Sequence, residues 1–235
     1  MKIELLFPEV CGLYGDAQNY EYLKKSLPDA EFIVTDFLST PYFFENDPDI
    51  ICIGSMSEEM QRRVLEKFKP RKDRINELIE KGTVILATGN AAELFCEKIE
   101  YITEKKEAEG LGVFPLIART DLFKRYNGKV LGECDGIEIV GFRAQFSFIY
   151  GDNSDCYFLK MTRGDGINTE SKYEGMRKNN LMCTTCLGPI LVLNPLFTEY
   201  IISLAGGTEK AAFREEAMAA YEKRLAEFHN PKVKF

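Results

Sequence analysis

The sequence predicts an α/β fold in three layers, with a mostly parallel sheet between flanking helices. Strand-like and helix-like segments alternate along roughly the first hundred residues, which is typical of right-handed βαβ units. Segment 49–54, DIICIG, is apolar almost throughout, as in a strand buried on both faces. The second half is rich in strand-like segments and polar turns, so we expect antiparallel strands that extend the sheet.

The elements of the first half follow from their residue patterns. We expect strands at 2–7, 31–37, 49–54 and 83–88. We expect helices at 16–27, 57–68, 71–81 and 90–99. Asp16 and Ser57 are suitable N-caps, because their side-chain oxygens can accept from the free N–H groups of a first helical turn. Gly82 is a suitable end for the third helix.

The second half has a different pattern. Strand-like segments lie at 113–118, 129–133, 136–150 and 156–162. A helix is expected to begin at Pro195 and to end before Gly206, and Thr208 is expected to cap a last helix. No linker or repeat divides the chain, so we expect residues 1–235 to form a single domain.

Composition narrows the possible functions. The formal net charge of −7 disfavours nucleic-acid binding, which requires a basic surface. No segment reaches the ~20 apolar residues that span a bilayer, and the N-terminus does not resemble a signal peptide, so no membrane insertion is expected. Seven cysteines in apolar contexts indicate free thiols in the cytoplasm. No cofactor is expected.

Several kinds of catalytic or metal site are disfavoured by the residues present. The one histidine, His229, lies near the C-terminus in a polar context, so histidine-dependent hydrolysis is not expected. Cys183 and Cys186 form a CxxC without a second pair, and on a strand their side chains point to opposite faces, so no metal site is predicted. The acidic residues, among them Glu58 and Glu174, are expected in solvated loops.

Sites in parallel sheets form at the carboxyl ends of strands. Candidate segments are therefore 13–16, 54–57, 88–90 and 182–195. These segments, in this order, resemble class I glutamine amidotransferases of the cobyric acid synthase and lipid II isoglutaminyl synthase amidotransferase-subunit family. Leu13-Tyr14-Gly15-Asp16 and Asn19 match the first family motif, and residues 174–195 align without a gap with the last.

The resemblance implies a flavodoxin-like amidotransferase fold and a specific site. The family's nucleophile turn reads roughly AICGGYQLLG, and with this alignment Thr88 takes the place of the cysteine and Ala92 that of the glutamine. Leu187 takes the place of the catalytic histidine. A threonine facing a leucine has no route to activation, so no intact catalytic residues are predicted. The remaining candidate pocket residues are Gly54, Ser55, Gly89, Asn90 and Gly188.

Three hypotheses about function remain. By resemblance, the first is a pseudoenzyme that binds a partner, a Mur-ligase-like ATP-dependent ligase of cell-wall synthesis, or a small ligand. The second is an active glutamine amidotransferase that supplies ammonia to a ligase through a relocated cysteine, with candidates Cys11, Cys52, Cys183 and Cys186. The third is a protein that shares only the fold and binds an unrelated small ligand.

Overall fold

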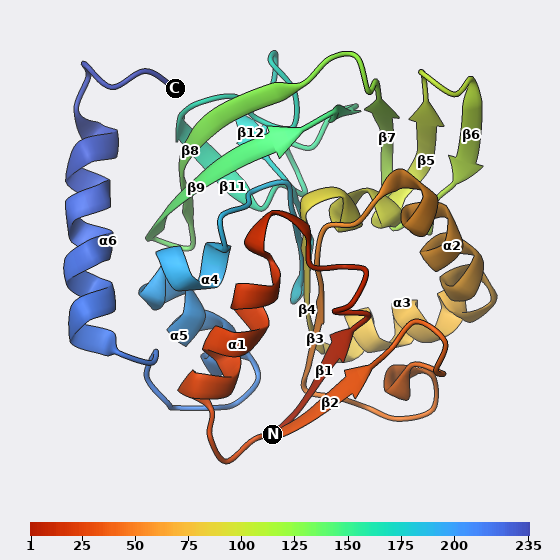
Figure 1. The fold of residues 1–235 in the computed structure, drawn as a ribbon, viewed down its shortest axis with the longest axis horizontal. Coiled ribbons are helices and arrows are strands. Elements are labelled where there is room, and N and C mark those ends of the chain that lie inside the picture. The colour runs from red at the N-terminus through yellow and green to blue at the C-terminus, as the bar shows by residue number, and fades with distance from the viewer.

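A six-stranded sheet forms the centre of the computed structural model, which describes residues 1–235 (Figure 1). Its strand order is β13-β14-β4-β3-β1-β2, and every neighbouring pair is parallel except β13 with β14. The strands are β1 (Lys2–Leu6), β2 (Glu31–Thr35), β3 (Ile50–Ile53), β4 (Val84–Thr88), β13 (Met176–Lys178) and β14 (Leu181–Thr184). The predicted α/β fold with a mostly parallel sheet is confirmed.

Helices cover both faces of this sheet (Figure 1). One face packs against α1 (Ala17–Ser26), α4 (Ile190–Leu193) and α5 (Pro195–Leu204), and the other against α2 (Glu58–Phe68) and α3 (Lys72–Lys81). Consecutive β3 residues show the alternation, since Ile51 lies in the core cluster of Val64 and Cys52 in that of Leu23. The last helix, α6 (Arg214–His229), packs outside these layers against β9.

Most strands of the second half do not extend the main sheet as predicted. They form two further four-stranded sheets, of which one contains β5 (Cys96–Tyr101), β6 (Lys106–Glu109), β7 (Phe114–Thr120) and β10 (Ser147–Tyr150). The other contains β8 (Tyr126–Cys134), β9 (Ile137–Gln145), β11 (Leu159–Arg163) and β12 (Tyr173–Glu174). β4 already pairs with β3 and β14, so β5 finds no free edge beside it.

Some element boundaries differ from the sequence prediction. The expected helix at 90–99 is a short 3₁₀ helix, η4 (Gly89–Phe95), followed by β5, because residues from Cys96 onward pair with β6 and β7. The last helix begins at Arg214 rather than near Thr208. Ser57 does cap α2, accepting from the Met60 N–H at 3.3 Å, and Gly82 ends α3 with φ +83°. None of the helices has both the length and the apolarity needed to cross a bilayer.

Candidate functional site

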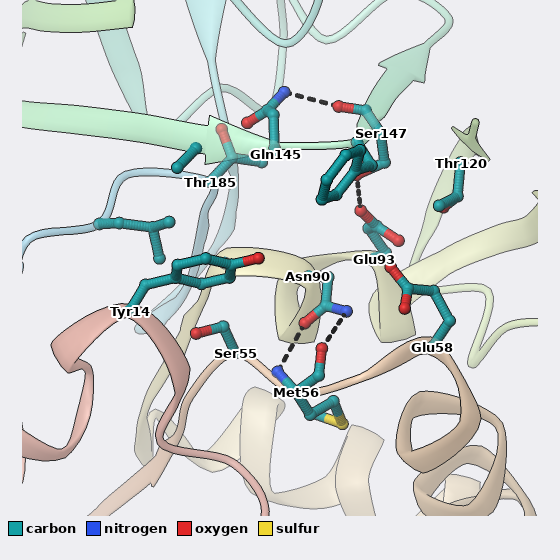
Figure 2. Close-up of a pocket in the computed structure, with 14 residues that line it drawn as sticks. Tyr14, Ser55, Met56, Glu58, Asn90, Glu93, Thr120, Gln145, Ser147 and Thr185 are labelled. Carbon is teal, nitrogen blue, oxygen red and sulfur yellow. Dashed lines mark hydrogen bonds between the residues drawn. The ribbon is translucent and has the colours of Figure 1, made fainter. Parts of the chain in front are cut away.

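A pocket lies at the carboxyl end of the main sheet, as expected for a parallel α/β fold (Figure 2). Residues that follow β1, β3, β4 and β14 form one side, and residues from the second-half sheets form the other. The volume of this cavity that is accessible to water is about 40 Å³. The lining residues are Tyr14, Ser55, Met56, Glu58, Gly89, Asn90, Glu93, Thr120, Ala144, Gln145, Phe146, Ser147, Thr185 and Leu187.

The structure brings together part of the predicted site. Ser55, Gly89, Asn90 and Leu187 all line the pocket. The other four predicted positions, Thr88, Gly54, Ala92 and Gly188, are absent from its lining. Each of the four predicted chain segments thus reaches the pocket, but not through every residue that the family motifs indicate.

The side chain of Thr88 is buried behind the pocket. Its hydroxyl donates to Asp16 Oδ2 at 2.9 Å, and only 2% of the residue is exposed. The same Asp16 oxygen accepts from the N–H and the hydroxyl of Ser55, each at 2.8 Å. Asp16 occupies the predicted N-cap position of α1, but its side chain does not cap the helix, because its carboxylate joins the loop after β3 to the end of β4. Burial raises the pKa of this carboxyl above its usual range.

Gly89 is the residue of the strand-to-helix turn that faces the pocket. Its φ of +60° lies in the left-handed region, which side chains adopt only with strain. A Cβ atom at Gly89 would lie 2.5 Å from Ser55 Cβ and 3.2 Å from Leu187 Cδ2. The space that a nucleophile's Cβ would need at this turn is therefore occupied by Ser55.

Replacing Gly89 with alanine is expected to lower the free energy of unfolding by about 2 kcal/mol, from left-handed strain plus overlap with Ser55. Gly206→Ala is the matched control, because Gly206 has φ +82° and an added Cβ atom there would meet only open space. It isolates the strain, which costs about 1 kcal/mol. Urea denaturation of both variants measures the difference. Equal costs would show that Ser55 leaves room for a side chain at Gly89.

Two backbone donors of the pocket wall are already bonded. The Ser55 N–H donates to Asp16, and the Met56 N–H donates to Asn90 Oδ1 at 2.9 Å. The Asn90 amide returns a hydrogen bond to the Met56 carbonyl at 2.8 Å, so its side chain is held at both ends (Figure 2). An oxyanion hole requires free donors aimed at the developing charge, and neither of these N–H groups is free.

The segment around Leu187 is fixed from two sides. The Leu187 N–H donates to the Phe142 carbonyl at 2.7 Å, and the Phe142 N–H donates back at 3.3 Å. Upstream, Glu174 accepts from the Thr185 N–H at 2.8 Å and faces Arg143 Nη2 at 3.7 Å. The prediction that Glu174 lies in a solvated loop is wrong, because it is 0% exposed and serves as a buried anchor for the end of β14.

Glu93 is a pocket residue that the sequence motifs do not indicate. It is 1% exposed, and its carboxylate accepts from Gln61 Nε2 at 2.8 Å and from the Ser147 hydroxyl (Figure 2). Burial raises its pKa to about 7, and the nearby carboxylate of Glu58 also acts to raise it, against the effect of the hydrogen bonds. No local motif marks Glu93, since Ser147 lies far along the chain.

The thiols and the histidine lie outside the pocket lining. Burial raises the pKa of Cys11 to about 12 and that of Cys52 to about 12. Cys183 and Cys186 belong to different core clusters, although Cys186 lies beyond the end of β14 rather than on the strand, and burial raises both of their pKa values. His229 bonds Glu138 at 2.7 Å near the end of α6, and 48% of its side chain is exposed.

The fold and pocket define an α/β protein with a strained strand-to-helix turn at the end of a parallel strand, where hydrolytic α/β enzymes present a nucleophile. The chain belongs to the CobB/CobQ-like glutamine amidotransferase domain family, whose model matches residues 2–191.

Comparisons with individual proteins are consistent with membership of this family. Over 198 residues the chain is 29% identical to the lipid II isoglutaminyl synthase (glutamine-hydrolyzing) subunit GatD of Staphylococcus aureus strain N315, covering 83% of this chain and 79% of the relative. A solved glutamine amidotransferase structure aligns with a TM-score of 0.57 at 15% identity, covering 87% of this chain and 98% of that one, which supports the fold.

Proposed function

We propose that this chain is a degenerate member of its family that does not hydrolyse glutamine. The observation that carries the proposal is the geometry at Gly89, where a side chain would overlap Ser55 and where Leu187 stands in the place of a base. Glutamine hydrolysis needs a nucleophile, a proton carrier and oxyanion donors at one point. Here the turn has no side chain, Leu187 cannot carry a proton, and the Ser55 and Met56 N–H groups are bonded elsewhere.

The geometry favours Gly89 rather than Thr88 as the nucleophile position. Thr88 points to Asp16, whereas Gly89 has the strained φ of the turn and lies against Leu187. Moving the motif AICGGYQLLG by one residue places its cysteine on Gly89 and its glutamine on Glu93. We therefore propose that Gly89 and Leu187 are the degenerate positions and that Glu93 replaces the glutamine.

A relocated cysteine finds little support. The four candidate thiols are buried, their pKa values are raised, and none lines the pocket. A thiolate is the reactive form, so such thiols are poor nucleophiles at neutral pH.

We expect incubation with glutamine to release no ammonia above the level of a heat-denatured sample. The glutamine analogue diazo-oxo-norleucine is expected to leave the protein mass unchanged, because no activated thiol faces the pocket. Intact-protein mass spectrometry provides this readout, and an active amidotransferase treated in parallel shows that the reagent works. A covalent adduct on any cysteine would contradict the proposal and favour the relocated-cysteine hypothesis.

We further propose that the chain acts in the cytoplasm as a partner or regulatory subunit of a Mur-ligase-like, ATP-dependent enzyme that forms amides. The support is the similarity to GatD, whose name describes a synthase subunit, together with a retained fold and a site without hydrolytic groups. Co-expression with the Mur-ligase-like protein of the same genome, followed by affinity capture and size-exclusion chromatography, tests this. A chain that elutes free of that ligase would favour the fold-only hypothesis.

A further inference from the structure

The pocket presents hydrogen-bond acceptors and no basic side chain. Two carboxylates, Glu58 and Glu93, are among its lining residues, while lysine, arginine and histidine are absent from them. Five hydroxyl groups add further polar atoms to the wall, those of Tyr14, Ser55, Thr120, Ser147 and Thr185. Such a surface repels carboxylates and phosphates and favours a ligand that carries positive charge and N–H donors.

Glu93 is a buried carboxylate without a counter-charge. Its contacts are with neutral groups, Gln61 Nε2 and the Ser147 hydroxyl, and it takes part in no ion pair. Arg62, on the neighbouring helix, instead stacks on the Tyr101 ring at 4.8 Å and pairs with Glu104 at 3.0 Å. A buried ionised carboxylate is costly unless a cation compensates it, and the pocket is the side from which a cation can reach Glu93.

A second acceptor in the same wall lacks a partner. Gln145 donates from Nε2 to the Ser147 carbonyl at 2.6 Å, and this bond fixes which end of the amide carries the oxygen (Figure 2). Its Oε1 atom is buried and has no hydrogen-bond partner. Unsatisfied buried acceptors are rare in folded proteins, so this oxygen, in a residue that lines the pocket, indicates a missing donor.

We propose that this pocket binds the ammonium group of a small primary amine, with Glu93 as the counter-charge and Gln145 Oε1 as an acceptor. The volume of about 40 Å³ holds about three water-sized groups, so a small amine fits, and the ammonium ion is the smallest member of the class. Tyr14, which is 50% exposed, also lines the pocket and is an aromatic group that a bound cation can contact. The inference rests on the proposed function in assuming that no glutamine chemistry takes place here.

Ligand binding is expected to strengthen with pH, since only ionised Glu93 attracts a cation. The titratable groups that face Glu93 are Glu58 on α2, and Cys96 and Tyr101 on β5. Burial raises the pKa of Cys96 and Tyr101, so both stay neutral near pH 7. The pKa of Glu93 is about 7, so affinity is expected to rise between about pH 6 and about pH 8.

Isothermal titration calorimetry of the full chain at about pH 8 tests the proposal, with ammonium chloride and methylammonium chloride as probes and the ionic strength held constant with sodium chloride. Both probes are expected to bind. Tetramethylammonium, which has no N–H group to donate to Glu93 or Gln145 Oε1, is expected not to bind. Glu93→Gln keeps the shape of the side chain and is expected to weaken binding about tenfold. Gln145→Leu, which removes the unpartnered oxygen, is expected to weaken it about threefold.

Glu66→Gln is the matched control, because Glu66 is exposed on α2 and its substitution removes the same charge. This variant is expected to bind like the native chain. Heat signals that are equal for ammonium, sodium and tetramethylammonium, or equal in the native and Glu93→Gln proteins, would overturn the proposal. Neither outcome affects the ligase-capture experiment or the diazo-oxo-norleucine experiment. Failure of this ligand proposal can therefore be distinguished from failure of the proposed function.

Discussion

Glu174→Gln is expected to lower the free energy of unfolding by about 3 to 5 kcal/mol, although it changes a single charge in a side chain of nearly constant size. Glu174 and Arg143 are both buried, with 0% and 1% of their side chains exposed, and their charged groups are 3.7 Å apart. Arg143 has one hydrogen bond, to the Gly166 carbonyl, while its Nε and Nη2 atoms have no hydrogen-bond partner. Loss of the carboxylate leaves this guanidinium charge buried without compensation.

A double variant separates loss of the charge pair from loss of hydrogen bonds. Arg143→Met removes the buried cation, so adding it to Glu174→Gln is expected to restore about 2 kcal/mol. Glu133→Gln, at an exposed position on β8, is the control and is expected to change stability by no more than about 0.5 kcal/mol. Urea denaturation followed by circular dichroism measures all four proteins. A cost below about 1 kcal/mol for Glu174→Gln would show that Arg143 does not depend on Glu174.

The second large effect is a dependence of the free energy of unfolding on pH, which is due to Glu93. The folded state raises the pKa of Glu93 from 4.5 to about 7, so between these values the folded chain binds this proton more tightly than the unfolded chain. The contribution of Glu93 to stability is present at low pH and is lost as the pH rises through this range. The loss amounts to about 3 kcal/mol, since each unit corresponds to about 1.36 kcal/mol.

Comparison of the native chain with Glu93→Gln isolates this term from other carboxylates. The neutral variant has an amide that can form hydrogen bonds with Gln61 and Ser147. Its free energy of unfolding is expected to increase by about 3 kcal/mol relative to that of the native chain between about pH 5 and about pH 8. Glu66→Gln is expected to show no such gain, because Glu66 is exposed. Urea unfolding at the two pH values provides the readout, and parallel pH curves for the native and Glu93→Gln proteins would disprove the raised pKa.

The sequence predicted the parallel half of the fold because its signals are local. Apolar strands, the Ser57 cap and the Gly82 helix end depend on a few neighbouring residues, and all are present in the structure. The positions of the second-half strands depend on which sheet edges are free, and a strand of the main sheet such as β14 comes from residues 181–184, far along the chain. Segment 90–99 illustrates the limit, since tertiary pairing turns its last residues into a strand.

The sequence predicted which chain segments meet at the candidate site, but it did not predict the buried carboxylates Glu93 and Glu174. Motif order located the turn at Gly89 and the facing residue Leu187, while the choice between Thr88 and Gly89 depends on a φ angle that the residue letters do not specify. Glu93 and Glu174 lie at or beside positions of the family motifs, but nothing in their local sequence indicates that they are buried. Both become special only through burial against residues from other elements, such as Ser147 and Arg143.

Under the proposed function, the overlap between a side chain at Gly89 and Ser55 also determines how hydrolytic activity could be engineered into this scaffold. The two residues follow different strands, and Leu187 comes from a third segment. A library of single substitutions therefore contains no variant in which a thiol has both room and a basic neighbour. Directed evolution toward a hydrolase would have to start from combinatorial libraries that vary all three positions together.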